Sequence, residues 1–300
     1  MAFRYINPGY ASLLNTAAGN TVQDTKYNTV NGVSIWQTDP KKGVLLPENA
    51  TELYIKCNTY CPSGAQPIFR LYAGNQTGFR LSWNNGWELN VWYNKAVNTI
   101  TENMTTHIPT TGFMVDKMQA IWMHIKEGDT NGIYQLFVDG KEIYSYTGKL
   151  SLSGNTDYPA NLVVMESDNS SFMYSNIIIS DQPIALNEQV YIVPAKSVET
   201  TWIKDDAGNY NTDTAGAELL QIPDMSSFPG GNNITGIAIA ADGMTGTTPI
   251  TGIFMKDGAE TQKGTLTPTA SASTAGEVSW TESMTATELA NRKFGWKAGV

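Results

Sequence analysis

The sequence is poor in charged residues. Asp, Glu, Lys and Arg together make up only 16% of its 300 residues, and acids outnumber bases to give a formal net charge of −9 at pH 7. A protein that binds nucleic acid needs a basic surface to neutralise phosphates. This balance therefore argues against nucleic acid as a partner.

Cysteine and histidine are almost absent. The chain has two cysteines, Cys57 and Cys61, and two histidines, His107 and His124. A structural zinc ion takes four such ligands at characteristic spacings, which these positions do not match. We therefore predict no metal site and interpret the cysteines as two thiols near a turn, reduced or bridged.

Long apolar runs are also missing. No stretch of 18 or more apolar residues occurs, which argues against a spanning helix, so no membrane partner is expected. The N-terminal residues MAFRYINPGYASLLN lack a basic region followed by a continuous apolar segment, so no signal peptide is predicted. Synthesis in the cytoplasm without an export signal is the expectation.

What the sequence does have is glycine (27), tyrosine (14), tryptophan (8) and many short segments with alternating apolar residues. This mixture favours short strands and tight turns. Helical periodicity is scarce: we expect one short helix near residues 10–17 and another over 286–292, where Thr285 and Glu288 form a capping box. Strands at regular spacing with few helices between them predict β-sandwiches.

The segment FRLSWNNGWELNVWY, residues 79–93, has the clearest alternation. A three-residue loop Asn84-Asn85-Gly86 would pair Trp83 with Trp87, Leu81 with Leu89 and Phe79 with Val91, with all apolar partners on one face. The opposite face then carries the following side chains: Arg80, Ser82, Glu88, Asn90 and Trp92.

A second hairpin is predicted in IYQLFVDGKEIYSYTG, residues 133–148, because an Asp-Gly pair separates two apolar-rich runs. A two-residue turn at Asp139-Gly140 would place Leu136 opposite Ile143. A loop that includes Lys141 would place Leu136 opposite Tyr144. Both registers bury plausible partners, so the sequence leaves the choice open.

The strand pattern breaks at Pro183, and a new pattern begins with QVYIVPA. We therefore predict an N-terminal segment over 1–30, one domain over 31–185 and a second over 186–300. In the first domain, strands are expected at 122–126, 161–166 and 175–181. In the second, strands are expected at 200–204, 216–222, 234–241, 250–256 and 277–283, with a final strand at 294–300.

Three features in the first half occur in a familiar order: a Trp122-Met-His-Ile strand, a Val-Asp-Gly hairpin at 138–140, and a strand that ends in Asp181. This succession resembles the closing half of a laminin G-like, concanavalin A-like jelly roll, over roughly residues 30–185. The resemblance implies a fold and no active site. The predicted fold class is all-β, a concanavalin A-like jelly-roll sandwich followed by a smaller β-sandwich.

The second half has a different resemblance. An acidic-apolar opening at 217–220, a strand pair around 234–255 and a short helix leading into a last strand are similar to C-terminal modules of tailed-phage and prophage structural proteins. The resemblance implies a virion protein that is assembled in the bacterial cytoplasm. Its expected partners are other virion proteins and, by analogy with trimeric fibre proteins, further copies of itself.

The acidic residues contain one incomplete catalytic pattern. Glycoside hydrolases of jelly-roll architecture use a Glu-x-Asp-x-x-Glu strand, and Glu166 and Asp168 begin such a pattern, but Ser171 stands where the second Glu should be. No nucleophile elbow, phosphate-binding loop or zinc-protease motif occurs. We predict no catalytic residues and no enzyme activity.

Calcium is the one metal ion that the resemblance suggests as a ligand. Laminin G-like domains often bind it through loop carboxylates and carbonyls. Asp129, Asp157 and Asp168 are loop residues of the required type, but no ligand spacing singles any of them out. No cofactor is therefore predicted.

Sugars bind to proteins by stacking on aromatic rings while polar side chains orient their hydroxyls. Trp92 shares its face with Asn90, Arg80 and Glu88, and these four are the predicted ligand-binding residues. The alternative is that a second sheet covers this face and Trp92 belongs to the core.

The predicted function is a non-enzymatic virion protein, tail- or fibre-associated, whose jelly roll binds host-surface glycans. A secreted bacterial adhesin or carbohydrate-binding module is the main alternative. A glycan-degrading enzyme is a weaker one, because the carboxylate set is incomplete.

Overall fold

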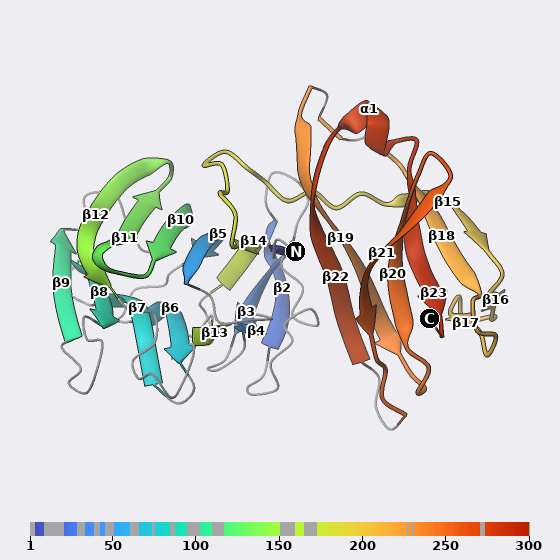
Figure 1. Cartoon of the computed structure of the whole chain (residues 1–300), viewed down its shortest axis with the longest axis horizontal. Helices are drawn as coiled ribbons and strands as arrows, with labels where there is room; N and C mark the ends of the chain where they lie inside the picture. Colours follow the sequence, from blue (N-terminus) through green and yellow to red (C-terminus); the bar gives the residue numbers. More distant parts are fainter. Residues whose placement is uncertain are drawn as a thin grey trace. The chain divides into compact units, whose positions relative to one another are not determined.

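The computed structural model describes the backbone in most of the chain (Figure 1). It covers residues 4–8, 21–28, 34–38, 43–45, 51–60, 66–73, 76–84, 88–94, 103–109, 117–150, 160–164, 173–226, 228–229, 231–270 and 274–299. Side chains are described for residues 4–8, 44, 51–60, 117–150, 174–226, 228–229, 231–241, 243–270 and 276–299. The other ranges are described through their backbone pairing.

The chain forms two compact units. The first comprises residues 1–3 and 7–190, and the second comprises residues 4–6 and 191–300. The sequence placed the boundary between residues 185 and 186, whereas the structure divides the chain between Val190 and Tyr191. In the described part of the chain, no helix is long and apolar enough to cross a membrane.

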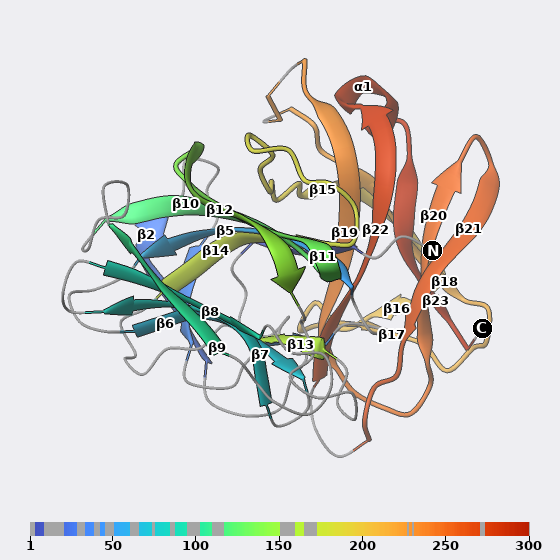
Figure 2. The ribbon, with the colours of Figure 1, turned by 60° about the vertical axis from the view of Figure 1, so that its left-hand side comes forward.

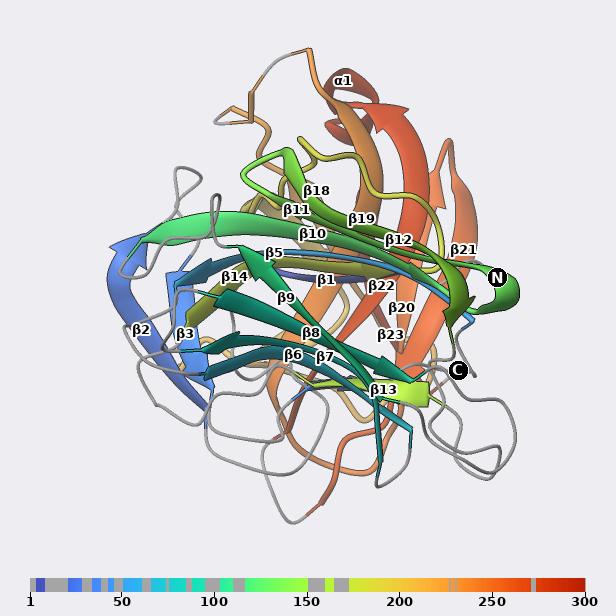
Figure 3. The same ribbon diagram turned by 90° about the vertical axis from the view of Figure 1, so that its left-hand side faces the viewer.

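The first unit contains two sheets, which Figures 2 and 3 show as separate layers. In spatial order, one sheet consists of β12 (Lys141–Leu150), β11 (Gly128–Val138), β10 (Met118–Lys126), β5 (Glu52–Tyr60), β14 (Met173–Ser180), β3 (Ser34–Thr38) and β2 (Thr21–Asn28). The other consists of β4 (Gly43–Leu45), β13 (Ala160–Val164), β6 (Gln66–Ala73), β7 (Gln76–Asn84), β8 (Glu88–Asn94) and β9 (Asn103–Pro109).

Alternate residues of the larger sheet form the core of the first unit. The fully buried side chains include Leu53, Ile55, Met123, Tyr134 and Tyr174. In β5 and β10 the odd-numbered residues turn toward the core, because side chains of a strand alternate between the two faces of a sheet. The even-numbered residues consequently lie on the opposite face, called here the outer face.

The hairpin of β11 and β12 has the two-residue turn of one predicted register and the Leu136–Tyr144 pairing of the other. Asp139 and Gly140 have φ angles of 49° and 79°, as a type I′ turn requires, so Val138 pairs with Lys141. A β-bulge follows, after which Leu136 lies opposite Tyr144. The turn has two residues, and the bulge supplies the offset.

The register predicted for β7 and β8 is wrong by two positions. Leu81 pairs with Val91 rather than Leu89, and Trp83 pairs with Leu89. A shift of two residues leaves every side chain on the same face, because the side-chain period of a strand is two. The apolar pattern could therefore not distinguish the two registers.

The second unit is a smaller β-sandwich. Its main sheet has the order β15 (Ala195–Thr200), β18 (Glu218–Pro223), β23 (Lys293–Ala298), β20 (Ile250–Lys256) and β21 (Ala259–Leu266). A long ribbon pairs β19 (Asn233–Met244) with β22 (Thr274–Thr285), and a short one pairs β16 (Ile203–Lys204) with β17 (Tyr210–Asn211). Ile237 and Trp280 of the long ribbon pack with Phe254 and Trp296 of the main sheet.

In the second unit, the predicted strand pair around 234–255 is wrong and the predicted capping box is right. The strand pair around 234–255 does not form, because β19 pairs with β22 while β20 pairs with β21 and β23. The capping box is confirmed: Thr285 Oγ1 accepts from Glu288 N, and the Glu288 carboxylate accepts from Thr285 N. The helix, α1 (Ala286–Leu289), is shorter than the predicted 286–292.

The N-terminal residues 4–6 belong to the second unit. Ile6 N donates to Glu277 Oε1, and Arg4 donates to Thr235 Oγ1. A Cβ atom at Gly236 would lie only 2.6 Å from Arg4 Nε, so glycine permits this close approach. The prediction of an N-terminal segment over 1–30 did not include this docking of residues 4–6.

The fold class is confirmed: the described chain is all-β, a jelly-roll sandwich followed by a smaller β-sandwich, with α1 as its one α-helix. The helix expected near residues 10–17 lies outside the described residues.

Candidate functional site

The outer face of the larger sheet of the first unit gathers polar and aromatic side chains. Glu52, Tyr54 and Lys56 occupy alternate positions of β5, and Trp122, His124 and Lys126 occupy alternate positions of β10. Their neighbours in sequence, such as Leu53 and Ile125, fill the core. The alternation that builds the core therefore also builds this face.

Antiparallel pairing brings these residues together in rows across the strands. Glu52 lies opposite Lys126, Tyr54 opposite His124, and Lys56 opposite Trp122. Directly opposite side chains in such a ladder lie close enough to interact. On the far side of β10, Gln135 of β11 extends the row of Tyr54 and His124.

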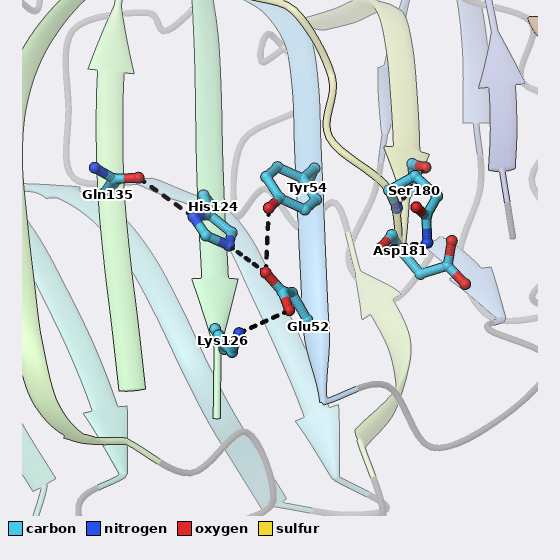
Figure 4. A network of polar contacts seen from close by, with 8 residues as sticks. Glu52, Tyr54, His124, Lys126, Gln135, Ser180 and Asp181 are labelled. Carbon is cyan, nitrogen blue, oxygen red and sulfur yellow. Dashed lines mark hydrogen bonds and ion pairs between the residues drawn. The ribbon is translucent and has the colours of Figure 1, made fainter. Parts of the chain in front are cut away.

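Five of these residues form a connected network, which we call the outer-face network: Glu52, Tyr54, His124, Lys126 and Gln135 (Figure 4). His124 Nε2 and the Tyr54 hydroxyl both contact Glu52 Oε1, at 2.9 and 3.1 Å, and Lys126 Nζ lies 3.2 Å from Glu52 Oε2. His124 Nδ1 lies 3.3 Å from Gln135 Oε1. The Glu52 carboxylate is the centre on which three donors converge.

The network fixes the protonation of Glu52 and Tyr54. Partial burial raises the pKa of Glu52, but hydrogen bonds from His124, Lys126 and Tyr54 outweigh it and hold the pKa below its ordinary value. Burial, together with the hydrogen bond to Glu52 and its charge, raises the pKa of Tyr54 to about 12. At neutral pH Glu52 is thus an anion and Tyr54 a neutral phenol.

His124 is the most enclosed member of the network, with only 8% of its surface exposed. Because a carboxylate can only accept, His124 Nε2 carries a hydrogen and donates it to Glu52. Its ring stacks on Tyr54, with centroids 4.2 Å apart and planes 5° from parallel. The sequence interpreted His124 as a packed residue, which agrees with its burial, but did not identify its polar partners.

The next row is covered by residues 182–190, called here the covering segment. Lys56 Nζ donates to the carbonyls of Leu186 and Glu188, and Trp122 Nε1 donates to the carbonyl of Ile184 at 2.8 Å. Burial lowers the pKa of Lys56 to about 8. The outer-face network lies beside this covered row, and its Lys126 and Glu52 side chains remain 40% and 32% exposed.

The binding residues predicted from the sequence lie on the other sheet. Arg80 belongs to β7, and Glu88, Asn90 and Trp92 belong to β8. Pairing places Arg80 opposite Trp92, which brings their backbones side by side. The side chains of all four lie outside the described residues, so this platform stays a prediction.

The structure describes only some of the residues that the sequence offers as catalytic or metal-binding candidates. Glu166, Asp168, Ser171, Asp157 and the side chains of Cys61 and His107 lie outside the described residues. Cys57 is a free thiol in the core, and burial raises its pKa well above the ordinary value. Among the described residues, no three His, Cys, Asp or Glu side chains gather as a metal site would require.

The sequence contained part of the signal for the outer-face network. Alternation alone places Glu52 and Tyr54 on one face of their strand and His124 and Lys126 on one face of theirs. The two strands are far apart in the chain, however, and no local pattern states that they pair. Sequence reasoning consequently missed Glu52, Tyr54, Lys126 and Gln135.

No known protein family matches the chain, and no curated protein matches its sequence. Its structure is similar to a Trypanosoma rangeli sialidase (9% identity, TM-score 0.36), with 61% of this chain and 34% of the sialidase covered. It is also similar to a Caenorhabditis elegans galectin (10%, 0.34; 49% and 93% covered). A third similar structure is the CBM40 of the Ruminococcus gnavus IT-sialidase bound to alpha2,3 sialyllactose (11%, 0.36; 51% and 92%). The chain thus spans about a third of the sialidase, and similarities this low assign no activity.

Proposed function

We propose that the protein binds glycans through the outer-face network and performs no chemistry on them. The observation that carries the proposal is an aromatic stack, Tyr54 on His124, beside hydrogen-bonding groups of both kinds that are partly open to solvent. Sugars present apolar C–H faces to aromatic rings, and their hydroxyls both donate and accept hydrogen bonds. The network offers partners for both.

The protonation states of the network argue for binding rather than catalysis. Glycosidic bond hydrolysis commonly needs two carboxyl groups, one of which must hold a proton at the working pH. Glu52 is the single carboxylate of this network, and its hydrogen bonds keep it ionised. A phenol whose pKa is raised to about 12 is a poor general base at neutral pH.

The test is a binding measurement on immobilised polysaccharides with the full chain. Tyr54→Ala removes the ring of the stack and should weaken binding about tenfold or more, as for an aromatic contact at a binding hot spot. Tyr54→Phe keeps the ring and should retain most of the affinity. Tyr210→Ala, in the second unit, is the control for the loss of a tyrosine, and circular dichroism checks that each variant is folded.

Two results would overturn the glycan-binding proposal. One is the absence of binding by the unmodified chain to any polysaccharide of a broad panel. The other is a folded Tyr54→Ala protein that binds as tightly as the unmodified chain. Turnover of a polysaccharide would instead contradict the non-enzymatic part of the proposal.

We further propose that the protein is a component of a phage or prophage virion, associated with the tail or a fibre and assembled in the bacterial cytoplasm. Support comes from the charge-poor, all-β chain and from the short capped helix that leads into the last strand, β23. Mass spectrometry of particles purified after prophage induction should find the chain with other virion proteins. Its presence on the cell surface and absence from particles would favour the adhesin. Light scattering would test the expected homo-oligomer.

A further inference from the structure

We infer, resting on the proposed glycan-binding function, that the Glu52–Lys126 ion pair recognises two adjacent hydroxyl groups of an uncharged sugar. The pair lies at the exposed edge of the outer-face network, directly across the β5–β10 ladder. It would set the class of ligand that the site accepts.

Glu52 and Lys126 retain hydrogen-bonding capacity that no described residue uses. Glu52 Oε1 already accepts from His124 and Tyr54, whereas Oε2 contacts only Lys126. A carboxylate oxygen can accept two hydrogen bonds, and an ammonium group has three donors. One acceptor position on Oε2 and two N–H groups of Lys126 are therefore left for a ligand.

The arrangement of these open groups matches a vicinal diol. Oε2 and Nζ are 3.2 Å apart, and two hydroxyl oxygens on neighbouring ring carbons lie at a comparable separation. One hydroxyl can donate to Oε2 while its neighbour accepts from Nζ, so each sugar oxygen meets a charged partner. The network also holds the carboxylate in place before a ligand arrives, because three donors fix it.

The charges around the pair disfavour an acidic sugar. Lys126 is already neutralised by Glu52, and a ligand carboxylate beside Oε2 would place two anions against one ammonium. Lys56, the one cation of β5, is buried under the covering segment.

The experiment compares three probes that separate the diol from the charge. Galactomannan is neutral and has vicinal diols. Galactomannan that has been oxidised with periodate and reduced with borohydride is neutral but has lost them. Alginate keeps vicinal diols but carries a carboxylate on every sugar. We expect binding to galactomannan, with affinities for the oxidised polymer and for alginate at least about tenfold lower, the loss that one charged hydrogen bond represents.

Variants assign the effect to the ion pair. Lys126→Met keeps the aliphatic stem, removes the donors and should weaken galactomannan binding about tenfold. Lys141→Met is the matched control, since Lys141 is an exposed lysine in the turn region of the same sheet. Glu52→Gln removes the acceptor charge and should relieve the discrimination against alginate.

The outcomes distinguish this inference from the function on which it rests. Tighter binding of alginate than of galactomannan, lost in Lys126→Met, would overturn the diol assignment while glycan binding stands. Undiminished binding of the oxidised polymer would overturn it as well. Failure to bind any of the three probes or any other polysaccharide would remove the glycan-binding function itself.

Discussion

Replacing Lys56 by methionine should loosen the covering segment. The Lys56 side chain is only 5% exposed, and its ammonium group donates to the carbonyls of Leu186 and Glu188. Methionine keeps a similar length and apolar stem but has no donor. Both carbonyls would then lose this partner, while the core on the other side of β5 is untouched.

The size of the effect follows from two opposing contributions. Two hydrogen bonds from a charged donor together stabilise the segment by about 3–6 kcal/mol. Burial of the charge opposes this, and a pKa lowered from 10.5 to about 8 corresponds to about 3 kcal/mol. The remainder is on the order of 1.5 kcal/mol, which is about a tenfold change in the opening equilibrium.

Hydrogen exchange with mass spectrometry measures this opening directly. Glu188 N donates to the Ala185 carbonyl at 3.0 Å, so its exchange reports on the segment. Peptides covering residues 182–190 should exchange about tenfold faster in Lys56→Met, and Lys141→Met should leave them unchanged. Equal protection in the Lys56→Met and unmodified proteins would refute the reasoning that the lysine holds the segment.

The same residue predicts a pH dependence. Burial holds the pKa of Lys56 near 8 in the folded protein, so between about pH 8 and its ordinary 10.5 the unfolded chain binds more protons. The contribution of Lys56 to the free energy of unfolding is therefore fully present above about pH 10.5 and is lost as the pH falls through about 8. Urea unfolding at pH 7.5 and 9.5 measures the free energy of unfolding of both proteins. Raising the pH should increase it by roughly 1–2 kcal/mol more in the unmodified protein than in Lys56→Met. If the difference in free energy of unfolding between the two proteins were the same at both pH values, the lowered pKa of Lys56 would be contradicted.

Three further predictions concern other parts of the chain. Trp92→Ala tests the platform predicted from the sequence as a second glycan site, separate from the outer-face network: it should weaken the binding at that site by about 1–3 kcal/mol in calorimetry, with circular dichroism unchanged, whereas loss of the fold would place Trp92 in the core. Thr285→Ala removes the N-cap of α1 and should lower the stability of the second unit by about 1 kcal/mol in scanning calorimetry, whereas an unchanged transition would deny the cap any role. Burial raises the pKa of Glu277 to about 8, so stability should fall as pH rises from about 4.5 to 8. Glu277→Gln should flatten that fall in a thermal melt series, and an undiminished slope would assign it to another group.

Local chemistry determined several elements from the sequence alone. The Asp139-Gly140 turn and the Thr285–Glu288 capping box depend on residues within four positions of one another, so no distant contact is needed to specify them. The strand β21 was not predicted, because it lacks such a local signal. Its sequence AETQKGTL faces solvent along much of its length and carries no alternating apolar pattern.

Apolar alternation also determined which face of a strand is buried, but not which strands are neighbours. Shifting β7 against β8 by two residues preserves every face, so the pattern was satisfied by the wrong register as well as by the right one. Only the complete ladder, with β6 and β9 on either side, settles the pairing.

The sequence by itself determined an all-β chain with two sandwiches, because period-two patterning and turn residues are local properties. Tertiary structure alone decided that β5 pairs with β10, which brings Tyr54 onto His124 and Glu52 beside Lys126. It also decided that residues 4–6 complete the second unit against β19 and β22. Such contacts join residues from about 70 to more than 200 positions apart, as with Glu52 and His124 or Arg4 and Thr235. They arise from the shape and packing of whole sheets, which no short stretch of sequence encodes.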